Sequence, residues 1–324
     1  MWIQLKNVLL VTVLLSTILL TGCEDLEGLV TEQVTHSLNN VSFHMRLVPG
    51  SRFRELEFEQ PPKRIVDGDY WIAETPVTYA LWYEVITWAT GNGYVFGNPG
   101  REGNNSVTGL APTDRQTEPV TTVSWLDCVV WLNALTEYYN LLHGTEYTRV
   151  YYDGDDIIKD SKNLLAYDSL VEKPATTGFR LLTRDEWEIA ARYLGPSKPT
   201  DHPLNLQVIK RRGFYWLPQN YVTGATDFYT NEGAMAAVSW YKVNSNSRTQ
   251  AVGQKPINDS VLGLYDMSGN VSEWVNSPSV SANSNMRPFM GGSWTSDAFR
   301  LRVDRMSFRS GPNSTTGLRI GRTP

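Results

Sequence analysis

The sequence predicts an α+β domain with few helices, many short strands and much irregular backbone. Helical spacing of apolar residues appears in only three segments, while short strand-like segments alternate with turns rich in Gly, Asn and Asp. The chain also contains 11 Trp and 25 Gly in 324 residues. Glycines allow loop backbone to approach a sheet closely, and tryptophans fill the gaps that irregular loops leave. We therefore expect irregular loops packed closely against the regular elements of the domain.

Residues 1–22 are predicted to be the signal peptide of a lipoprotein. Lys6 precedes a 13-residue apolar run at residues 8–20, which is too short for a membrane-spanning helix of ~20 residues and suits a signal peptide. The sequence Leu-Thr-Gly-Cys at residues 20–23 resembles a lipobox, in which the cysteine receives the lipid. Acylated Cys23 would anchor the protein to a membrane without spanning it. The alternative is a buried apolar helix that happens to precede a cysteine.

Residues 23–40 are predicted to be the lipid-anchored tether, because they are polar and contain few aromatic residues. From residue 41 to residue 324 the chain is dense in Trp, Tyr and Gly, and no long Pro/Ser-rich break divides it. We expect one domain over residues 41–324, since insertions into a core account for its size.

Two longer helices are expected in the first half of this domain. Thr78 precedes residues 79–89, in which apolar side chains recur three or four positions apart. Ser124 likewise precedes residues 125–140, a second amphipathic pattern. Each preceding residue carries a side-chain oxygen that can accept from the first free backbone N–H groups of a helix.

A third, short helix is expected to begin after Thr183 and to continue through Tyr193. Thr183 and Glu186 form the T-x-x-E pattern of a capping box. Strand-like alternation appears at residues 147–152 and 299–303. In the second of these, Arg302 and Val303 are expected to continue the strand.

Composition excludes several classes of function. The net charge is −5, or −6 without residues 1–22, because Lys6 is the only charged residue there. A mildly acidic chain without a basic cluster is a poor nucleic-acid binder, so no nucleic-acid partner is expected. With Cys23 acylated, Cys128 would have no disulfide partner and is interpreted as a buried structural thiol. The four histidines show no metal-site spacing.

Several segments in order resemble the formylglycine-generating-enzyme (sulfatase-modifying factor) family. They are RLLTRDEWE at residues 180–188, GLYDMSGNVSEW at 263–274, GGSW at 291–294 and GLR at 317–319. The resemblance extends over about residues 41–322. It implies an α+β fold of the C-type lectin type, in the variant found in formylglycine-generating enzymes. That variant has a small mixed sheet, two main helices and long structured loops.

The same resemblance argues against catalysis. Catalytic members oxidise a sulfatase cysteine with two cysteines of their own that follow the GGSW-type segment. The corresponding positions here are Ser296 and Leu301, and no cysteine follows residue 128. Copper-dependent oxidation needs soft thiolate ligands, so the chain is predicted not to be an enzyme.

The resemblance also implies a structural calcium ion as a cofactor. In relatives the segment matching residues 266–273 surrounds calcium, and carboxylates with backbone carbonyls can supply the six to eight oxygens it needs. The alternative is that the two acids cap turns and pair with a nearby arginine. Carried over by position, the ligands would be Asp266, Ser268, Gly269, Val271 and Glu273.

Residues 295–316 resemble the variable region of lipoproteins that retroelements diversify. The segment mixes Thr, Ser, Asp, Phe, Arg and Asn and lacks Lys, Glu, Gln and Trp, which is typical of adenine-directed mutagenesis; Met306 would be an exception. The alternative is an ordinary polar loop. Such a face offers aromatic anchors, arginine forks and small hydroxyl groups, as antibody paratopes do. The predicted ligand-binding residues are Thr295, Ser296, Asp297, Phe299, Arg300, Asp304, Arg305, Ser307, Phe308, Arg309, Asn313, Ser314 and Thr315.

Together these observations predict a lipid-anchored protein of the cell surface, in the outer membrane, that binds a variable ligand and catalyses nothing. The expected partner is a protein on another cell or on a host. Two alternatives stay open at this point. One is an enzyme of the same superfamily with relocated chemistry, and the other is an invariant structural lipoprotein of the envelope.

Overall fold

A computed structural model describes residues 32–50, 66, 68–164, 169–196, 209–211, 214–256, 262–277 and 285–324. The predicted signal peptide and Cys23 lie outside these residues. No helix among the described residues is long and apolar enough to cross a membrane.

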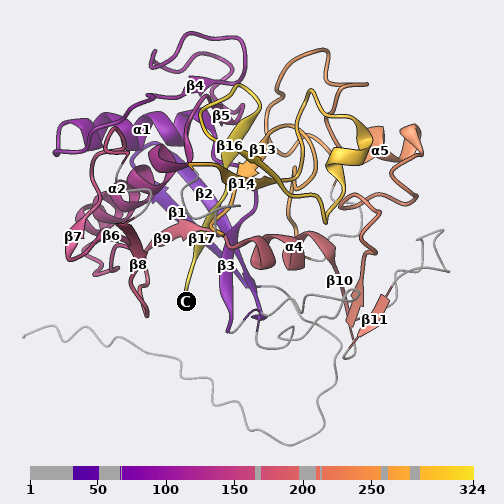
Figure 1. The fold of residues 1–324 in the computed structure, drawn as a ribbon, viewed down its shortest axis with the longest axis horizontal. Helices are drawn as coiled ribbons and strands as arrows, with labels where there is room; N and C mark the ends of the chain where they lie inside the picture. Colours follow the sequence, from indigo (N-terminus) through magenta and orange to yellow (C-terminus); the bar gives the residue numbers. More distant parts are fainter. Residues whose placement is uncertain are drawn as a thin grey trace, which may run out of the picture.

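The largest sheet has five strands, and every neighbouring pair is antiparallel. The C-terminal strand lies inside this sheet, where Gly321 is paired with Ile72 on one side and with Arg180 on the other (Figure 1). The two ends of the domain therefore share one sheet. In sheet order the strands are β1 (Gln33–Leu38), β2 (Val41–Val48), β3 (Tyr70–Ala73), β17 (Ile320–Arg322) and β9 (Phe179–Leu181).

Strand β1 corrects the predicted boundary of the tether. Its six residues pair in register with β2, from Gln33 opposite Arg46 to Leu38 opposite Val41. Leu38 is buried against the main core. The segment has a polar composition because β1 is an edge strand with one face toward solvent. Since β1 belongs to the main sheet, the domain begins by residue 33, and the tether prediction is wrong for residues 33–38.

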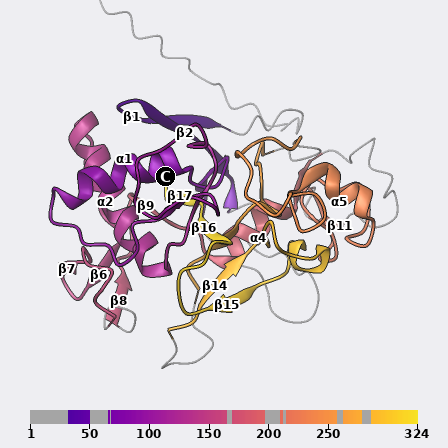
Figure 2. The same cartoon turned by 90° about the horizontal axis from the view of Figure 1, so that it is seen from above.

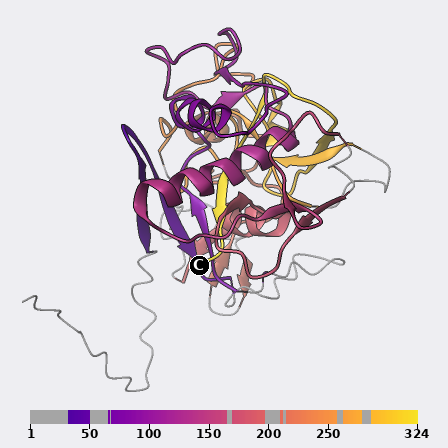
Figure 3. The same ribbon diagram turned by 90° about the vertical axis from the view of Figure 1, so that its left-hand side faces the viewer.

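Two helices cover one face of this sheet, and both begin where the sequence predicted. Helix α1 (Tyr79–Thr90) begins after Thr78, whose side chain accepts from the Leu81 N–H at 3.3 Å. Helix α2 (Trp125–His143) begins after Ser124 and crosses in front of the sheet (Figure 3). Trp82 and Trp131 stack between the helices, with ring centroids 5.1 Å apart.

Asp127, in the first turn of α2, fixes this helix to the loops around it. Its carboxylate accepts from the Ser124 N–H at 2.8 Å, which completes a capping box, and from the backbone N–H groups of Gly97 and Asn98, both at 3.1 Å. The buried hydroxyl of Ser161 donates to the same carboxylate. This buried charge is therefore compensated by several donors.

The predicted capping box also starts α4 (Arg184–Arg192). The Thr183 hydroxyl accepts from the Glu186 N–H at 3.1 Å, and the Glu186 carboxylate accepts from the Thr183 N–H at 2.8 Å. The helix ends at Arg192, because Tyr193 has extended backbone and begins β10. Trp187 in α4 belongs to a second hydrophobic core with Met267 and Met290.

A four-stranded sheet carries the C-terminal region (Figure 2). Its central strands β13 and β14 are antiparallel, and β16 runs parallel to β13. Residues near the end of the chain are thereby placed beside the GNVSEW segment. In sheet order the strands are β15 (Ser307–Arg309), β14 (Arg287–Met290), β13 (Ser272–Trp274) and β16 (Thr316–Leu318).

Short elements complete the described fold. The remaining strands are β4 (Arg101–Glu102) with β5 (Val120–Thr121); β6 (Tyr151–Asp153) with β7 (Asp156–Ile157) and β8 (Leu170–Glu172); and β10 (Tyr193–Gly195) with β12 (Phe214–Trp216) and β11 (Ile209–Arg211). The remaining helices are α5 (Glu232–Val238) and the 3₁₀ helix η2 (Ala298–Leu301).

Two strand predictions need correction. The strand expected at residues 147–152 forms only as β6, which begins at Tyr151. The one expected at residues 299–303 is wrong: residues 298–301 form η2, capped by the Asp297 side chain, which accepts from the Arg300 N–H at 3.2 Å. The alternation arose because Leu301 and Val303 are both buried, which a 3₁₀ turn followed by extended backbone also achieves.

Candidate functional site: a cationic pocket on the C-terminal face

The GGSW segment forms a sharp turn that starts the candidate site. Gly291 and Gly292 both have positive φ, +89° and +68°. A Cβ on either would lie 2.8 Å from a backbone oxygen, so only glycine fits. Trp294 then ties the turn to its surroundings, since its N–H donates to the Asn270 carbonyl at 2.9 Å and its indole N–H to the Ser314 carbonyl at 3.1 Å.

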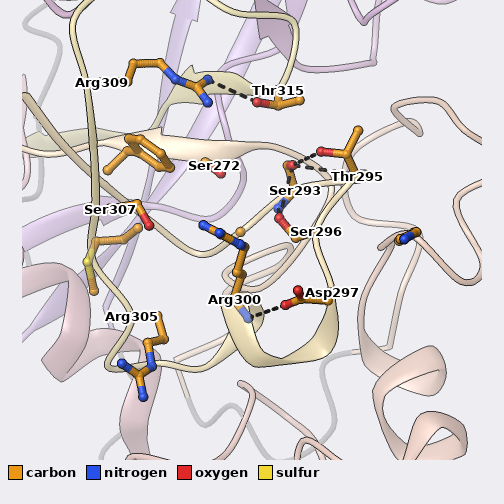
Figure 4. Close-up of a pocket in the computed structure, with 14 residues that line it drawn as sticks. Ser272, Ser293, Thr295, Ser296, Asp297, Arg300, Arg305, Ser307, Arg309 and Thr315 are labelled. Atoms are coloured by element: carbon orange, nitrogen blue, oxygen red, sulfur yellow. Dashed lines mark hydrogen bonds between the residues drawn. The ribbon is translucent and has the colours of Figure 1, made fainter.

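A pocket of about 240 Å³ lies beside this turn (Figure 4). Its wall comes from β13, β14, β15 and η2, together with the loop at Lys242. Six of the lining side chains carry hydroxyl groups and four carry positive charge, whereas Asp297 is the only acid. The lining residues are Lys242, Ser272, Phe289, Met290, Gly292, Ser293, Thr295, Ser296, Asp297, Arg300, Arg305, Ser307, Arg309 and Thr315.

The pocket brings together eight of the thirteen residues predicted to bind ligand, and the other five lie outside its lining. Phe299 is exposed over 43% of its surface beside the pocket residue Arg300. Asp304 forms an ion pair with Arg302, and Asn313 accepts from the Thr315 N–H and hydroxyl. Phe308 and Ser314 are half-buried. Which of the thirteen contact a ligand stays a prediction.

Two of the four cations interact with aromatic rings. The Arg309 guanidinium lies 4.9 Å from the centroid of Phe289 and donates to the hydroxyls of Thr315 and Thr316 at 3.1 and 2.7 Å. Burial lowers the Arg309 pKa from its ordinary value. The Arg305 guanidinium lies 4.0 Å from the centroid of Phe299 and points away from Arg300 in Figure 4.

The Arg300 side chain is different because its guanidinium has no partner among the described residues. Its backbone N–H donates to the Asp297 side chain, but the Arg300 side chain extends into the space between Ser296 and Ser307 (Figure 4). Lys242 is exposed, and its backbone N–H donates to the Ser296 carbonyl at 3.1 Å. The pocket thus carries positive charge that the surrounding chain does not neutralise.

The two positions to which the resemblance assigns the catalytic cysteines of relatives hold groups of another kind. Ser296 is buried, and its hydroxyl accepts from the Ser293 N–H at 2.9 Å. Leu301 is fully buried in an apolar cluster with Met235 and Tyr241. Cys128 lies in the main core, and burial raises the pKa of its thiol well above its usual range. This confirms the interpretation of Cys128 as a buried thiol.

Glu273, one of the predicted calcium ligands, is engaged by protein groups instead. Its carboxylate accepts from Arg319 Nε at 3.1 and 3.0 Å, from Arg319 Nη2 at 2.7 Å and from the Trp187 indole N–H at 2.7 Å. A guanidinium in this position would repel a calcium ion, so Glu273 does not fit the role of a ligand. The alternative of pairing with a nearby arginine describes its surroundings.

The other predicted calcium ligands lie in the adjoining turn. One oxygen of Asp266 accepts from the Gly253 N–H at 2.7 Å, and the other is buried with no partner among the described residues. Burial raises the pKa of Asp266 to about 6. Ser268 Oγ accepts from the Thr223 N–H at 3.3 Å. Calcium binding by Asp266 with the carbonyls of Ser268, Gly269 and Val271 stays a prediction.

Sequence reasoning missed the part of the pocket that lies outside residues 295–316. Lys242 and Phe289 come from segments outside every motif of the sequence analysis, and Ser272 lies in the GLYDMSGNVSEW segment, which was assigned to calcium and not to the binding face. The small side chain of Ser272 leaves the hydroxyl-lined wall of the pocket open.

A comparison with known families matches residues 31–324 to the sulfatase-modifying factor enzyme 1-like domain. The curated chaperone protein LppX of Paenibacillus barcinonensis is 26% identical over 279 residues, which are 81% of this chain and 82% of that protein. The family match begins at residue 31 and therefore includes β1.

Solved structures share the fold. Treponema denticola variable protein 1 has a TM-score of 0.63 and 23% identity, over 90% of this chain and 99% of that one. The structure of CarF has a TM-score of 0.62 and 26% identity, over 86% and 98% of the two chains. These matches confirm the predicted α+β fold, the C-type lectin variant of the formylglycine-generating type.

Proposed function

Since the chain belongs to the family of sulfatase-modifying factor enzyme 1-like domains, we propose that it uses this fold for binding and not for catalysis. In this proposal it is a lipid-anchored surface protein that binds a protein ligand through residues 295–316. The observation that carries the proposal is the pocket itself, to which this segment contributes eight of the lining residues.

The chemistry of the site supports binding without catalysis. Ser296 and Leu301 cannot supply thiolates for copper, which favours soft sulfur ligands. Cys128 lies in the core with a raised pKa, so it is a poor nucleophile and a poor metal ligand. An enzyme with relocated chemistry would need a different reactive group in a cleft.

A direct assay separates these alternatives. The purified protein would be incubated with copper(I), oxygen and a peptide that contains the target cysteine of a sulfatase. We expect no change in the peptide's mass, because the two cysteine positions hold Ser296 and Leu301. Conversion of the peptide cysteine to formylglycine would overturn the proposal.

Support for a protein ligand comes from the composition of the face. Exposed Phe299 next to arginine and hydroxyl side chains is the combination that carries affinity in many protein interfaces. The Paenibacillus relative is named a chaperone, which also implies a protein partner for that relative. In our proposal the ligand belongs to another cell or to a host.

We further propose that residues 295–316 are diversified by a retroelement. The test is to sequence the DNA beside the gene and to look for a near-copy of the codons for residues 291–322 next to a reverse transcriptase. A copy that differs chiefly at adenines is the expected result. Sister sequences that differ equally at all positions would instead favour an invariant structural lipoprotein of the envelope.

The proposed anchor is Cys23, with the domain displayed on the outer membrane. Cells that express the full chain would be grown with labelled palmitate, and a Cys23→Ala variant would serve as the control. Label in the parent chain only, together with removal of the domain by protease added to intact cells, is the expected result. Unlabelled parent protein would contradict the anchor, and resistance of the domain to protease would contradict surface display.

A further inference from the structure

The pocket has an excess of positive charge that the surrounding structure leaves unneutralised. Lys242, Arg300 and Arg309 line it, and among the residues that the structure describes no carboxylate lies within ion-pair distance of any of the three. The Arg300 guanidinium has no hydrogen-bond partner in this part of the chain and points into the pocket (Figure 4). A guanidinium offers five N–H donors in a fixed fork.

The two nearby acids do not cancel this charge. One oxygen of Asp297 caps η2 by accepting from the Arg300 backbone N–H. Asp304 is held by two hydrogen bonds from Arg302, at 3.1 and 3.0 Å, and lies 3.9 Å from Arg305 Nε. Asp304 is therefore already paired, and Asp297 alone faces several cations.

Hydroxyl groups line the same pocket around the cations. Ser293 and Ser296 are held by the turn, since Ser296 Oγ accepts from the Ser293 N–H and lies 3.3 Å from Ser293 Oγ. Thr295 and Ser307 lie at the edge of the same pocket, on opposite sides of Arg300 (Figure 4). Hydroxyl donors beside a guanidinium fork suit an anion with two acceptor oxygens.

The size of the pocket indicates what kind of anion enters it. A volume of about 240 Å³ is smaller than the 300–1,000 Å³ typical of sites that enclose a small-molecule ligand. It can admit one side chain of a larger partner. Exposed Phe299, next in sequence to Arg300, offers that partner an apolar contact outside the pocket.

We propose that this pocket binds the carboxylate of an Asp or Glu side chain on the protein ligand, and that Arg300 is the principal contact. The inference rests on the proposed function and specifies the chemistry of its ligand. Lys242 adds charge from outside the variable region. Arg309 is held in place by Thr315, Thr316 and Phe289 and contributes charge from the wall.

The test uses the full chain, immobilised in detergent, and a library of peptides with acetylated N-termini and amidated C-termini. One arm carries Asp or Glu at a fixed central position and a matched arm carries Asn or Gln. A third arm carries phosphoserine, and a fourth carries a free C-terminal carboxylate. We expect preferential retention of the first arm, with retention falling as salt rises.

Variants assign the effect to the pocket. Arg300→Gln should reduce retention of the acidic arm at least about tenfold, because it removes a charge-assisted contact. Arg248→Gln removes the same charge from an exposed arginine outside the pocket lining and should leave retention unchanged. Since Arg300 has no side-chain partner in the described structure, the variant should fold, which circular dichroism would verify.

The outcomes separate this inference from the proposed function. Equal retention of acidic and neutral peptides, or unchanged retention by Arg300→Gln, would overturn the carboxylate assignment while leaving a binding protein. Stronger Arg300-dependent retention of phosphoserine peptides would assign the pocket to phosphate instead, and of free C-termini to a terminal carboxylate. Retention of no peptide in any arm, together with no template copy in the genome, would overturn both.

Discussion

Arg319 and Arg300 are both arginines, but Arg319 lies in the protein core and Arg300 lies on the surface beside the pocket. Arg319 is fully buried, and its five N–H donors are used on Glu273 and on the carbonyls of Ala73, Glu74 and Tyr265. Arg300 is exposed, and its guanidinium faces the pocket without a partner among the described residues. The first joins strands of the scaffold, and the second is available for a ligand.

This difference separates the buried scaffold from the proposed binding face. Glu273 lies on β13, and Arg319 directly follows β16, which pairs with β13. Residues 295–316 lie between Glu273 and Arg319 in the chain, so an exposed side chain in this segment can be replaced without removing either member of the buried ion pair.

The largest expected effect is from Arg319→Gln, which should lower the free energy of unfolding by roughly 3–5 kcal/mol. The substitution leaves the buried Glu273 carboxylate without its cation, which costs far more than the loss of an exposed ion pair. Urea unfolding, followed by tryptophan fluorescence, would measure the change.

Arg300→Gln is the matched control for that experiment. Because Arg300 is exposed and its side chain has no partner among the described residues, its replacement should change the free energy of unfolding by less than about 0.5 kcal/mol. Equal losses in the two variants would show that the pocket arginine is part of the scaffold, and the comparison would fail.

His36 on β1 is an exception within the scaffold, because it is 1% exposed and neither ring nitrogen has a partner among the described residues. Burial lowers its pKa to about 4, and the nearby charges of Arg322 and His143 add to the shift. The neutral ring is therefore favoured in the folded protein. Between pH 6.5 and about 4 the unfolded chain binds a proton at His36 more readily than the folded protein does. The contribution of neutral His36 to the free energy of unfolding is therefore fully present above pH 6.5 and is lost as pH falls from 6.5 to about 4.

The free energy of unfolding is expected to fall by roughly 3 kcal/mol over that pH range, because a pKa difference of one corresponds to about 1.36 kcal/mol. His36→Phe should flatten the decline, since Phe can stack on the same neighbours, Phe43 and Phe179. His44→Gln is the control, because His44 is exposed on β2. The same slope in His36→Phe and in the parent chain would assign the acid sensitivity to another group.

The sequence was informative where local chemistry decides the structure. Thr78, Ser124 and Thr183 start helices because each supplies a capping oxygen to backbone three residues on. It was misleading at residues 33–38 and 298–301. There, an edge strand and a 3₁₀ turn depend on which face the rest of the fold covers.

The candidate site was predictable only in part for the same reason. Residues 295–316 could be recognised by composition, but Ser272 and Phe289 reach the pocket through sheet pairing over long sequence distances. Lys242 reaches it from a loop whose backbone bonds to Ser296. The pairing of Glu273 with Arg319 was foreseen only as an alternative to calcium, because sequence does not reveal which carboxylates face a cation in the core.

A smaller effect is expected from Thr183→Ala, which should lower the free energy of unfolding by about 1 kcal/mol. The substitution removes the hydroxyl that accepts from the Glu186 N–H, while Arg180 still holds the Glu186 carboxylate through two hydrogen bonds of 2.8 and 2.7 Å. Thr183→Ser should restore the parent value, because serine caps equally well. A loss of several kcal/mol would mean that α4 depends on this cap far more than its packing against the core indicates.

The smallest effect on stability should come from Asp297→Asn, and it concerns the binding face directly. Asparagine can still cap η2 through its side-chain oxygen, so the free energy of unfolding should stay within about 0.5 kcal/mol of the parent. The substitution removes the only acid from the pocket lining, which should strengthen retention of Asp- and Glu-containing peptides by roughly two- to fivefold at low salt. Retention of the Asn and Gln peptides should not change. Weaker retention of the acidic peptides would show that Asp297 contributes to the ligand contact itself. The contrast between a cationic binding face and a neutralised scaffold would then fail.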